Sequence, residues 1–418
     1  MSKSWRWRTG CAAVAFCAAT VTSVRAQTFT TLVSFYGSSS NGASPLFMSL
    51  VQGTDGEFYG TTKYGGSPPY AKGTVFKITP QGALTTLHTF HGTNGAYPIA
   101  GLVEAANGMF YGSTQRGGTN SAGTIFRMTP AGDTTVIYNF SGGDGPQIST
   151  LIQASNGDLY GTTPTGGNGF GTIFKIGPTG TLTTVYSFGG SDGEQPDGLI
   201  QARDGDFWGT TYAGGANGYG TVFKYTPGGT ATTLHSFDLT DGANPRGGLT
   251  QATNGNFYGT TYKGGANGYG AIFVITSEGS LTVLDSFDLT NGAAPVAPLV
   301  QATDGNLYGT TGQGGANGYG EIFAIDAAGA LTILHSFDST DGSNPEGGLV
   351  QGTDGAFYGA TEYGGAYNNG TIYRLSVGSS HADTGRDLSG TSAVAFNGLP
   401  ATYTVVSPTE EISVRVIR

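Results

Sequence analysis

Residues 299–311 read LVQATDGNLYGTT, and near-copies of this phrase recur along the chain. Residues 249–261 read LTQATNGNFYGTT, and residues 349–361 read LVQGTDGAFYGAT. An aromatic residue marks the same place in each copy, at Tyr59, Tyr111, Tyr160, Trp208, Tyr258, Tyr308 and Tyr358. Seven copies of a unit of about 50 residues indicate a repeat protein, whose architecture is a solenoid, a propeller or an array.

One unit, residues 249–298, is predicted to contain four antiparallel strands joined by alternating short and long connections. The strands are expected at residues 249–253, 256–262, 271–276 and 280–287. Asn254 and Gly255 separate the first two strands, and this pair predicts a hairpin turn with positive φ at both positions. Phe257 and Tyr258 alternate across one strand, so both faces of the sheet are expected to be buried, as when sheets stack radially in a propeller.

The two ends of the repeat region predict a closed ring. Residues 29–35 (FTTLVSF) match the fourth strand of other units, such as residues 84–90 (LTTLHTF), but no first three strands precede them. The seventh unit, residues 349–375, has three strands and lacks the fourth. The early strand therefore completes the last sheet and leaves no bare terminal edge. We predict an all-β fold, a seven-bladed β-propeller of four-stranded antiparallel blades, over residues 27–376.

The first 26 residues have the features of a secretory signal peptide. Basic residues at positions 3, 6 and 8 precede a short apolar run at 11–21, and small residues surround a cleavage site after Ala26. Both cysteines lie in this segment, so the mature chain is expected to have no thiol and no disulfide. We expect an exported protein, extracellular, cell-surface or periplasmic, with no transmembrane segment in the mature chain.

The charge of the mature chain argues against nucleic-acid binding. Loss of residues 1–26 leaves 14 basic and 28 acidic side chains, a net charge of −14. Binding to nucleic acid or to anionic lipid requires a basic surface. The expected partner is therefore a polysaccharide or a cell-surface protein.

The repeat also resembles a known family. The phrases LVQATDGNxYGTT, GGANGxGTVFK and LTTLHSF over residues 28–376 resemble those of the GloVer tandem-repeat proteins, the choice-of-anchor group. The resemblance implies bacterial export and a repeat domain without an assigned activity. Residues 377–387 are predicted to be a linker. Residues 388–418 resemble part of an IPT/TIG immunoglobulin-like domain, with a hairpin turn at Asn397-Gly398.

The long loops carry the candidate ligand-binding residues. In a propeller the loops after the second and fourth strands emerge on one face, and here they are rich in Asn, Asp and Tyr. These residue types suit sugar recognition, because amides and carboxylates bond to hydroxyls and aromatic rings pack against apolar sugar faces. The same residue types also make turns for local reasons. The candidates are Asn217, Tyr219, Asn267, Tyr269, Asn317, Tyr319, Asp241 and Asp341.

Catalysis in a repeat protein requires residues that break the repeat. Glu321, Glu346 and Glu362 stand where other units carry different residues, and they map to one face around the sixth and seventh blades. A pair of carboxylates is the equipment of acid–base glycoside cleavage. The alternative is that these are isolated glutamates without a catalytic role.

Three further patterns have structural interpretations. His88, His235 and His335 share a position with Tyr and Val in other units, so no metal site is expected there. The first strands share a Gln or Glu position that could bridge neighbouring blades or form a polar ring, at Gln52, Glu104, Gln153, Gln201, Gln251, Gln301 and Gln351. No cofactor is expected, although FDLTDG (residues 237–242) and FDSTDG (residues 337–342) leave calcium as an alternative.

The sequence thus favours a non-enzymatic binding or adhesion module for a glycan or another cell-surface partner. The first alternative is a carbohydrate-active enzyme that uses the three glutamates. The second is a structural scaffold without a small ligand.

Overall fold

The computed structural model describes residues 27–37, 41–68, 71–144, 151–177, 180–377, 394–396 and 399–401. Residues Gln27–Val377 form one compact unit, and the described residues after Gly378 belong to a second unit. The predicted signal peptide lies outside the described residues, as do the predicted linker and most of the IPT/TIG-like segment. In the part of the chain that is described, no helix is long and apolar enough to cross a membrane.

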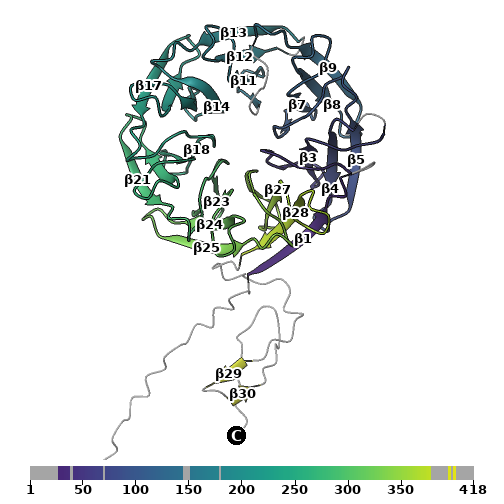
Figure 1. Ribbon diagram of the computed structural model, residues 1–418, viewed down its shortest axis with the longest axis vertical. Helices are drawn as coiled ribbons and strands as arrows, with labels where there is room; N and C mark the ends of the chain where they lie inside the picture. Colours follow the sequence, from purple (N-terminus) through teal and green to yellow (C-terminus); the bar gives the residue numbers. More distant parts are fainter. Residues whose placement is uncertain are drawn as a thin grey trace, which may run out of the picture. The chain divides into compact units, whose positions relative to one another are not determined.

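Seven four-stranded antiparallel sheets surround a common centre (Figure 1). We number these sheets as blades 1 to 7 in chain order. Blade 1 consists of β2 (Val51–Gln52), β3 (Phe58–Thr62), β4 (Thr74–Ile78) and β5 (Leu84–Thr89). Blade 2 consists of β6 (Val103–Glu104), β7 (Phe110–Thr114), β8 (Thr124–Met128) and β9 (Thr134–Asn139). Blade 3 consists of β10 (Ile152–Gln153), β11 (Leu159–Thr163), β12 (Thr172–Ile176) and β13 (Leu182–Ser187).

The next three blades repeat this order. Blade 4 consists of β14 (Glu194–Gln201), β15 (Phe207–Ala213), β16 (Thr221–Tyr225) and β17 (Ala231–Ser236). Blade 5 consists of β18 (Thr250–Gln251), β19 (Phe257–Thr261), β20 (Ala271–Ile275) and β21 (Leu281–Ser286). Blade 6 consists of β22 (Val300–Gln301), β23 (Leu307–Thr311), β24 (Glu321–Ile325) and β25 (Leu331–Ser336). The predicted all-β, seven-bladed propeller is confirmed.

Blade 7 joins the two ends of the repeat region. It consists of β26 (Val350–Gln351), β27 (Phe357–Thr361), β28 (Thr371–Ser376) and the early strand β1 (Thr28–Ser34). β1 lies antiparallel to β28, with Thr28 opposite Ser376 and Ser34 opposite Thr371 (Figure 1). The predicted closure of the ring by an N-terminal strand is confirmed, and the free edge of β28 is covered.

The hairpin turn after the first strand differs from the prediction. In blade 5 the first strand is only the two residues of β18, and the amide of Gly255 donates to the carbonyl of Ala252 (2.9 Å). Gly255 has a φ of 90°, but Asn254 is not among the residues with positive φ. The predicted turn with two positive φ angles is wrong, because the Asn254 side chain accepts the amide of Asn256 (3.1 Å) and holds a local turn that needs only one glycine.

The hydrophobic core lies between the blades. Phe257 and Tyr258 are 1% and 4% exposed, so both faces of the sheet are buried, as predicted. Phe257 stacks on Trp208 of blade 4 with ring centroids 3.8 Å apart. Tyr258 belongs to the cluster that blade 5 shares with blade 6. The next residue, Gly259, faces Phe273, where an added Cβ would come within 2.6 Å of the ring, so the repeated glycine lets that ring lie on the strand.

At every junction a Gln or Glu side chain of one blade accepts a backbone amide of the neighbouring blade. Gln301 accepts the amide of Thr253 in blade 5 (2.7 Å) and donates to the carbonyl of Gly305 in its own hairpin (3.0 Å). Gln52 accepts the amide of Thr353 (2.9 Å) and so links blade 7 to blade 1. The acceptors at the other five junctions are Glu104, Gln153, Gln201, Gln251 and Gln351. The predicted bridging of neighbouring blades is confirmed.

The second unit contributes one strand pair. β29 (Val394–Phe396) and β30 (Leu399–Ala401) are antiparallel, with Phe396 opposite Leu399. The predicted turn at Asn397-Gly398 lies outside the described residues.

Candidate functional site

Two sets of loops meet on one face of the propeller. We call the segment between the second and third strands of a blade its long loop, and the segment that leads to the next blade its return loop. Among the described residues, isolated β-bridges join five of the return loops to the long loop of the following blade, as between Ala243 and Lys263 and between Ser343 and Tyr363. The expectation that both sets emerge together is confirmed, and we call this side the loop face.

The three candidate asparagines hold the long loops in place. Asn217 donates its amide to the carbonyl of Phe237 (3.1 Å), and Asn317 donates to the carbonyl of Phe337 at the same distance. Asn267 donates to the carbonyl of Ser286 (3.2 Å). Each amide nitrogen is therefore engaged with the end of the fourth strand, and the amide oxygen is the group that remains for a ligand.

The three candidate tyrosines differ in exposure. Tyr269 and Tyr319 are each 42% exposed. Tyr219 is half-buried and packs against the core between blades 4 and 5. The backbone carbonyl of each tyrosine accepts an amide from the neighbouring return loop, at 2.7–3.0 Å. The loop backbone is thus anchored, and the rings of Tyr269 and Tyr319 remain open to solvent.

The two candidate aspartates lie in the return loops, shortly after the ends of β17 and β25. Asp241 accepts the backbone amide of Asp238 (3.0 Å), and its other oxygen lies 2.6 Å from His235 Nε2. Asp341 repeats the arrangement in blade 6, at 3.1 Å and 2.7 Å. In blades 2 and 3 a tyrosine hydroxyl takes the place of the histidine. The recurring histidine is therefore a partner of the return-loop aspartate.

Exposed large apolar side chains are confined to the loop face. In the part of the chain that the structure describes, the exposed large apolar side chains lie in long loops, in return loops or directly after β1. They are Tyr36, Tyr64, Leu239, Tyr269, Leu289, Tyr319, Tyr363 and Tyr367. Leu239 and Leu289 also have φ values of 77° and 75°, a backbone conformation that is strained for leucine. An apolar patch of this kind, displayed on one side, is typical of an interaction surface.

The loop face also carries a charged cluster, which we define as Lys63, Asp197, Arg246, Glu346 and Glu362. These residues occupy two positions of the unit, one directly after the return-loop proline and one directly after the second strand. Other blades carry Val296 and Gly312 at these two positions. The cluster is therefore a place where the seven-fold repeat is broken.

Glu346 and Glu362 are positioned by a shared backbone acceptor. Both of their amides donate to the carbonyl of Asn344, at 2.9 Å and 3.0 Å. Burial raises the pKa of Glu346 to about 7, with a further upward effect from Glu362, while Arg246 and Lys63 oppose the rise. Burial also raises the pKa of Glu362, and a hydrogen bond from Tyr363 opposes it. The structure brings these two sequence-predicted glutamates together.

Glu321 does not join them. It is 1% exposed at the start of β24, where one carboxylate oxygen accepts the Ser336 hydroxyl (2.7 Å) and the Ala316 amide (3.3 Å). Its other oxygen is buried without a hydrogen-bond partner. Glu321 therefore has a structural role, because its carboxylate links the long loop of blade 6 to the end of β25.

Sequence reasoning missed Arg246 and Asp197. The Arg246 guanidinium lies 4.7 Å from the ring centroid of Tyr212 and 5.3 Å from that of Tyr262, and its Nε is buried without a hydrogen-bond partner. Burial raises the pKa of Asp197 to about 6, and Arg246 opposes the rise. Both could have been found by comparing the units, as the glutamates were. Asp197, Arg246 and Glu346 each follow the proline at the equivalent position of their own return loop, and other units carry different residues there.

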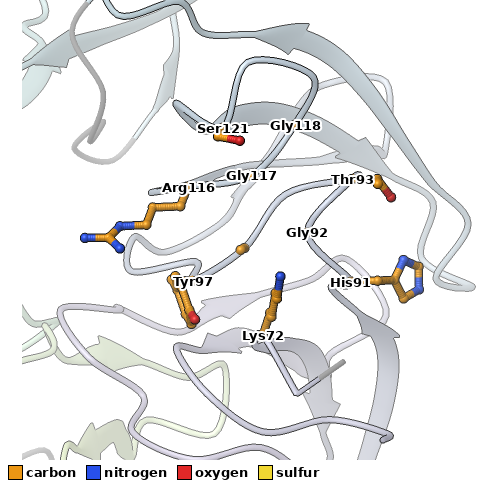
Figure 2. A pocket seen from close by; sticks show the side chains of 10 residues that line it. Lys72, His91, Gly92, Thr93, Tyr97, Arg116, Gly117, Gly118 and Ser121 are labelled. Atoms are coloured by element: carbon orange, nitrogen blue, oxygen red, sulfur yellow. The ribbon is translucent and has the colours of Figure 1, made fainter. Parts of the chain in front are cut away.

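A cleft of about 580 Å³ opens between the loops of blades 1 and 2 (Figure 2). Its walls include Lys72, His91, Tyr97, Arg116 and Ser121. Figure 2 shows the Lys72 side chain extending into the space between the two loops, with the Tyr97 ring beside it. The sequence patterns selected two glutamates of the charged cluster, but they did not indicate this cleft. The described residues contain no group of three or more His, Cys, Asp or Glu placed to hold a metal ion.

Comparison with protein families shows to which family the chain belongs. The family model of the Gloeobacter/Verrucomicrobia repeat matches residues 16–150, 106–301 and 228–405. The chain belongs to this repeat family. A comparison of this Gloeobacter/Verrucomicrobia repeat protein with curated protein sequences found no match.

Solved structures share the propeller fold with this repeat protein. Virginiamycin B lyase from Staphylococcus aureus, solved as an inactive variant with quinupristin, matches with a TM-score of 0.60 and 17% identity, over 84% of this chain and 100% of the lyase. The extracellular domain of a protein named as a one-component system from B. thetaiotaomicron matches with a TM-score of 0.55 and 13% identity. That match covers 80% of this chain and 38% of the other. At such identities the likeness concerns the fold alone.

Proposed function

We propose that this Gloeobacter/Verrucomicrobia repeat protein is an exported binding module that holds a carbohydrate on its loop face. The observation that carries the proposal is the one-sided display of large apolar side chains, of which six are tyrosines. The extracellular propeller domain among the structural relatives and the predicted signal peptide are consistent with an exported module.

Carbohydrate fits this surface better than a purely apolar ligand. Tyrosine offers a flat ring for the apolar face of a sugar and a hydroxyl for its polar edge. The carboxylates of Asp241 and Asp341 keep lone pairs beyond those used for the turn and the histidine, and these can accept hydrogen bonds from sugar hydroxyls. Because the loop backbones are anchored by bridges between blades, the surface is held in place before a ligand arrives.

The test is saccharide binding by a triple variant. Tyr219→Ala, Tyr269→Ala and Tyr319→Ala together remove three rings, and at about 0.5–1.5 kcal/mol per ring contact we expect affinity to fall at least tenfold. The matched Tyr→Phe triple variant keeps the rings and should stay within about threefold of the wild type. Calorimetry on hits from a broad saccharide array measures both. An array without any hit, or an alanine variant with full affinity, would contradict the proposal.

A second function is favoured by the meeting of Glu346 and Glu362. We propose acid–base cleavage of a glycosidic bond as the alternative activity. Glu346, with a pKa raised to about 7, gives its proton to the leaving oxygen. Glu362 takes a proton from the water molecule whose oxygen bonds to the anomeric carbon, so the products are two saccharides with free hydroxyls.

The three glutamates offer a built-in control for this alternative. Glu346→Gln and Glu362→Gln should each lower polysaccharide turnover by at least about 100-fold, the usual loss when an acid or base is removed. Glu321→Gln changes a carboxylate that contacts Ser336 and the long loop, and it should leave turnover intact. Turnover that survives both of the first two substitutions would exclude this mechanism.

A further inference from the structure

The cations of the loop face are unevenly distributed. The long loop of blade 1 (residues 63–73), the return loop after it (90–102) and the long loop of blade 2 (115–123) contain no Asp or Glu. They contain Lys63, Lys72, His91 and Arg116. The return loops after blades 4 and 6, by contrast, each carry two aspartates. In a chain with excess acidic residues, the sector around blades 1 and 2 is locally basic.

Lys72 and Arg116 have no carboxylate partner among the described residues. The lysines and arginines that do form ion pairs with carboxylates lie near the opposite end of the blades. They are Lys77, Lys175, Lys224 and Arg374, and each pairs with an acidic residue in the first hairpin of its own blade. An unpaired cation is free to meet an external anion. On the loop face Lys72 and Arg116 therefore stay available, whereas the cations at the opposite end are neutralised by carboxylates of their own blades.

The cleft between blades 1 and 2 holds these free cations in place. The carbonyl of Lys72 accepts the amide of Tyr97 (2.8 Å), and Arg116 exchanges two backbone hydrogen bonds with Ala96 (2.7 Å and 3.0 Å). An added Cβ at Gly92 would lie 2.8 Å from Lys72 Nζ, so the glycine leaves room for the ammonium group. Lys72 pairs with Gly65 as Tyr219 pairs with Gly214 and Tyr269 with Gly264, so a lysine replaces the loop tyrosine here.

The walls supply both parts of a recognition site for an acidic sugar. Figure 2 shows Lys72 extending between the loops, whereas the Arg116 side chain extends away from Lys72, on the side where the Tyr97 ring lies. Ser121 adds a hydroxyl from the loop opposite Lys72. Lysine and arginine bind carboxylate or sulfate oxygens, and an aromatic ring packs on the sugar face.

We propose that the cleft between blades 1 and 2 binds the carboxylate or sulfate group of an anionic saccharide. The proposal rests on the proposed function and names the class of carbohydrate. Lys72 holds the anionic group of the charged residue, and Tyr97 receives its ring. Arg116 meets a further anionic group of the same polymer, and the tyrosines on the rest of the loop face contact neighbouring sugars.

The test compares charged and neutral polymers of matched backbone on the mature protein. Polygalacturonate is compared with its methyl ester for the carboxylate, and dextran sulfate with dextran for the sulfate. We expect at least one charged polymer to bind at least tenfold tighter than its neutral counterpart, and we expect added salt to weaken that preference. The Lys72→Gln/Arg116→Gln double variant should lose the preference and keep its affinity for neutral saccharides.

Lys263→Gln is the matched control. Lys263 holds the place in blade 5 that Arg116 holds in blade 2, since both pair with the return-loop alanine before them. This variant should keep the preference for the charged polymer. Equal binding of charged and neutral polymers, or a preference that survives the double variant, would overturn the proposal while leaving the proposed function standing. A protein that binds no saccharide at all would overturn both.

Discussion

At the scale of single residues, one glutamine side chain makes two different hydrogen bonds at most blade junctions. Gln301 accepts an amide of blade 5 with its oxygen and donates to its own hairpin with its nitrogen. Glu104 occupies the same position in blade 2 and retains only the acceptor function, towards Thr54. The bond between blades therefore depends on the oxygen, and the nitrogen serves the local turn.

Substitution of Gln301 should separate these two functions. Gln301→Leu removes both hydrogen bonds and should lower the free energy of unfolding by about 1 kcal/mol, because water can reach the freed groups. Gln301→Glu keeps the acceptor for the Thr253 amide and should cost less than half as much. Urea denaturation of both variants measures the difference. Equal losses would mean that the oxygen has no special role.

Glu346 should make stability depend on pH. Its folded pKa is about 7, above the ordinary value of 4.5, so between these two values the folded state holds a proton that the unfolded state releases. Stability should therefore fall as pH rises from about 5 to 8, by about 2 kcal/mol for this group. Glu346→Gln should flatten that slope in denaturation curves recorded across the range. A slope unchanged in the variant would show that Glu346 titrates normally.

The charged residues show how far the sequence reaches at this scale. Comparison of the units selected Glu321, Glu346 and Glu362 as departures from the repeat, but it could not separate them. Glu321 begins a strand and points beneath a loop, whereas the other two donate their amides to one carbonyl, that of Asn344. That distinction depends on loop conformation, including a positive φ at Asn344, which one sequence does not reveal.

At the scale of elements, β1 closes the ring through one aromatic side chain, Phe29, as well as through its backbone. The Phe29 ring stacks on His335 of blade 6 with centroids 3.6 Å apart, and it lies 5.4 Å from Tyr373 of β28. β1 therefore pairs with blade 7 and packs on blade 6 at the same time. The alternation of Phe29 and Thr30 across the strand separates these contacts from solvent.

Phe29→Ala should loosen this closing strand. Loss of a half-buried ring should lower the free energy of unfolding by about 2 kcal/mol. It should also speed unfolding, because the edge of β28 becomes free more often. Thr30→Ala, on the exposed side of the same strand, should stay within about 0.5 kcal/mol of the wild type. Stopped-flow unfolding in guanidinium compares the two, and equal rates would contradict the role assigned to Phe29.

Strand positions were more predictable than turns. The predicted second, third and fourth strands of blade 5 coincide with β19, β20 and β21 to within one or two residues. β19 and β20 have buried side chains on both faces, and the buried Phe287 follows the end of β21. The first strand is shorter than predicted. Its ends are held by the Gln251 side chain and by the turn at Ala252 rather than by ladder pairing, so the apolar pattern overstates its length.

At the scale of the whole molecule, the two ends of the blades have different chemistry. The end with short hairpins pairs its cations with its own carboxylates and links the blades through glutamine. The loop face carries the exposed tyrosines, the charged cluster and the cleft with Lys72 and Arg116. The repeat thus uses one end for cohesion and leaves the other for recognition, which is why the units differ most in their loops.

The two ends of the repeat region share blade 7, and circular permutation can test how much this sharing stabilises the ring. Thr28 lies opposite Ser376, so a short linker can join the ends of the propeller. A permuted protein that starts at Ser280, after the turn between β20 and β21, again completes one blade with its first strand. A second permuted protein that starts at Thr290, in the exposed return loop, has seven blades that are each continuous.

The first permuted protein should unfold with nearly wild-type stability, because its ends remain tied by the hydrogen bonds of β20 and β21. In the second, the ring at the break is held by packing between blades, by the Gln301 bridge to blade 5 and by the Ala294 amide, which donates to the carbonyl of Tyr269. We expect its free energy of unfolding to be lower by at least about 2 kcal/mol, and its unfolding to be faster. Denaturation and unfolding kinetics of the two proteins, made with the same linker, measure the worth of the shared blade. Equal stability would show that blade packing alone closes the ring.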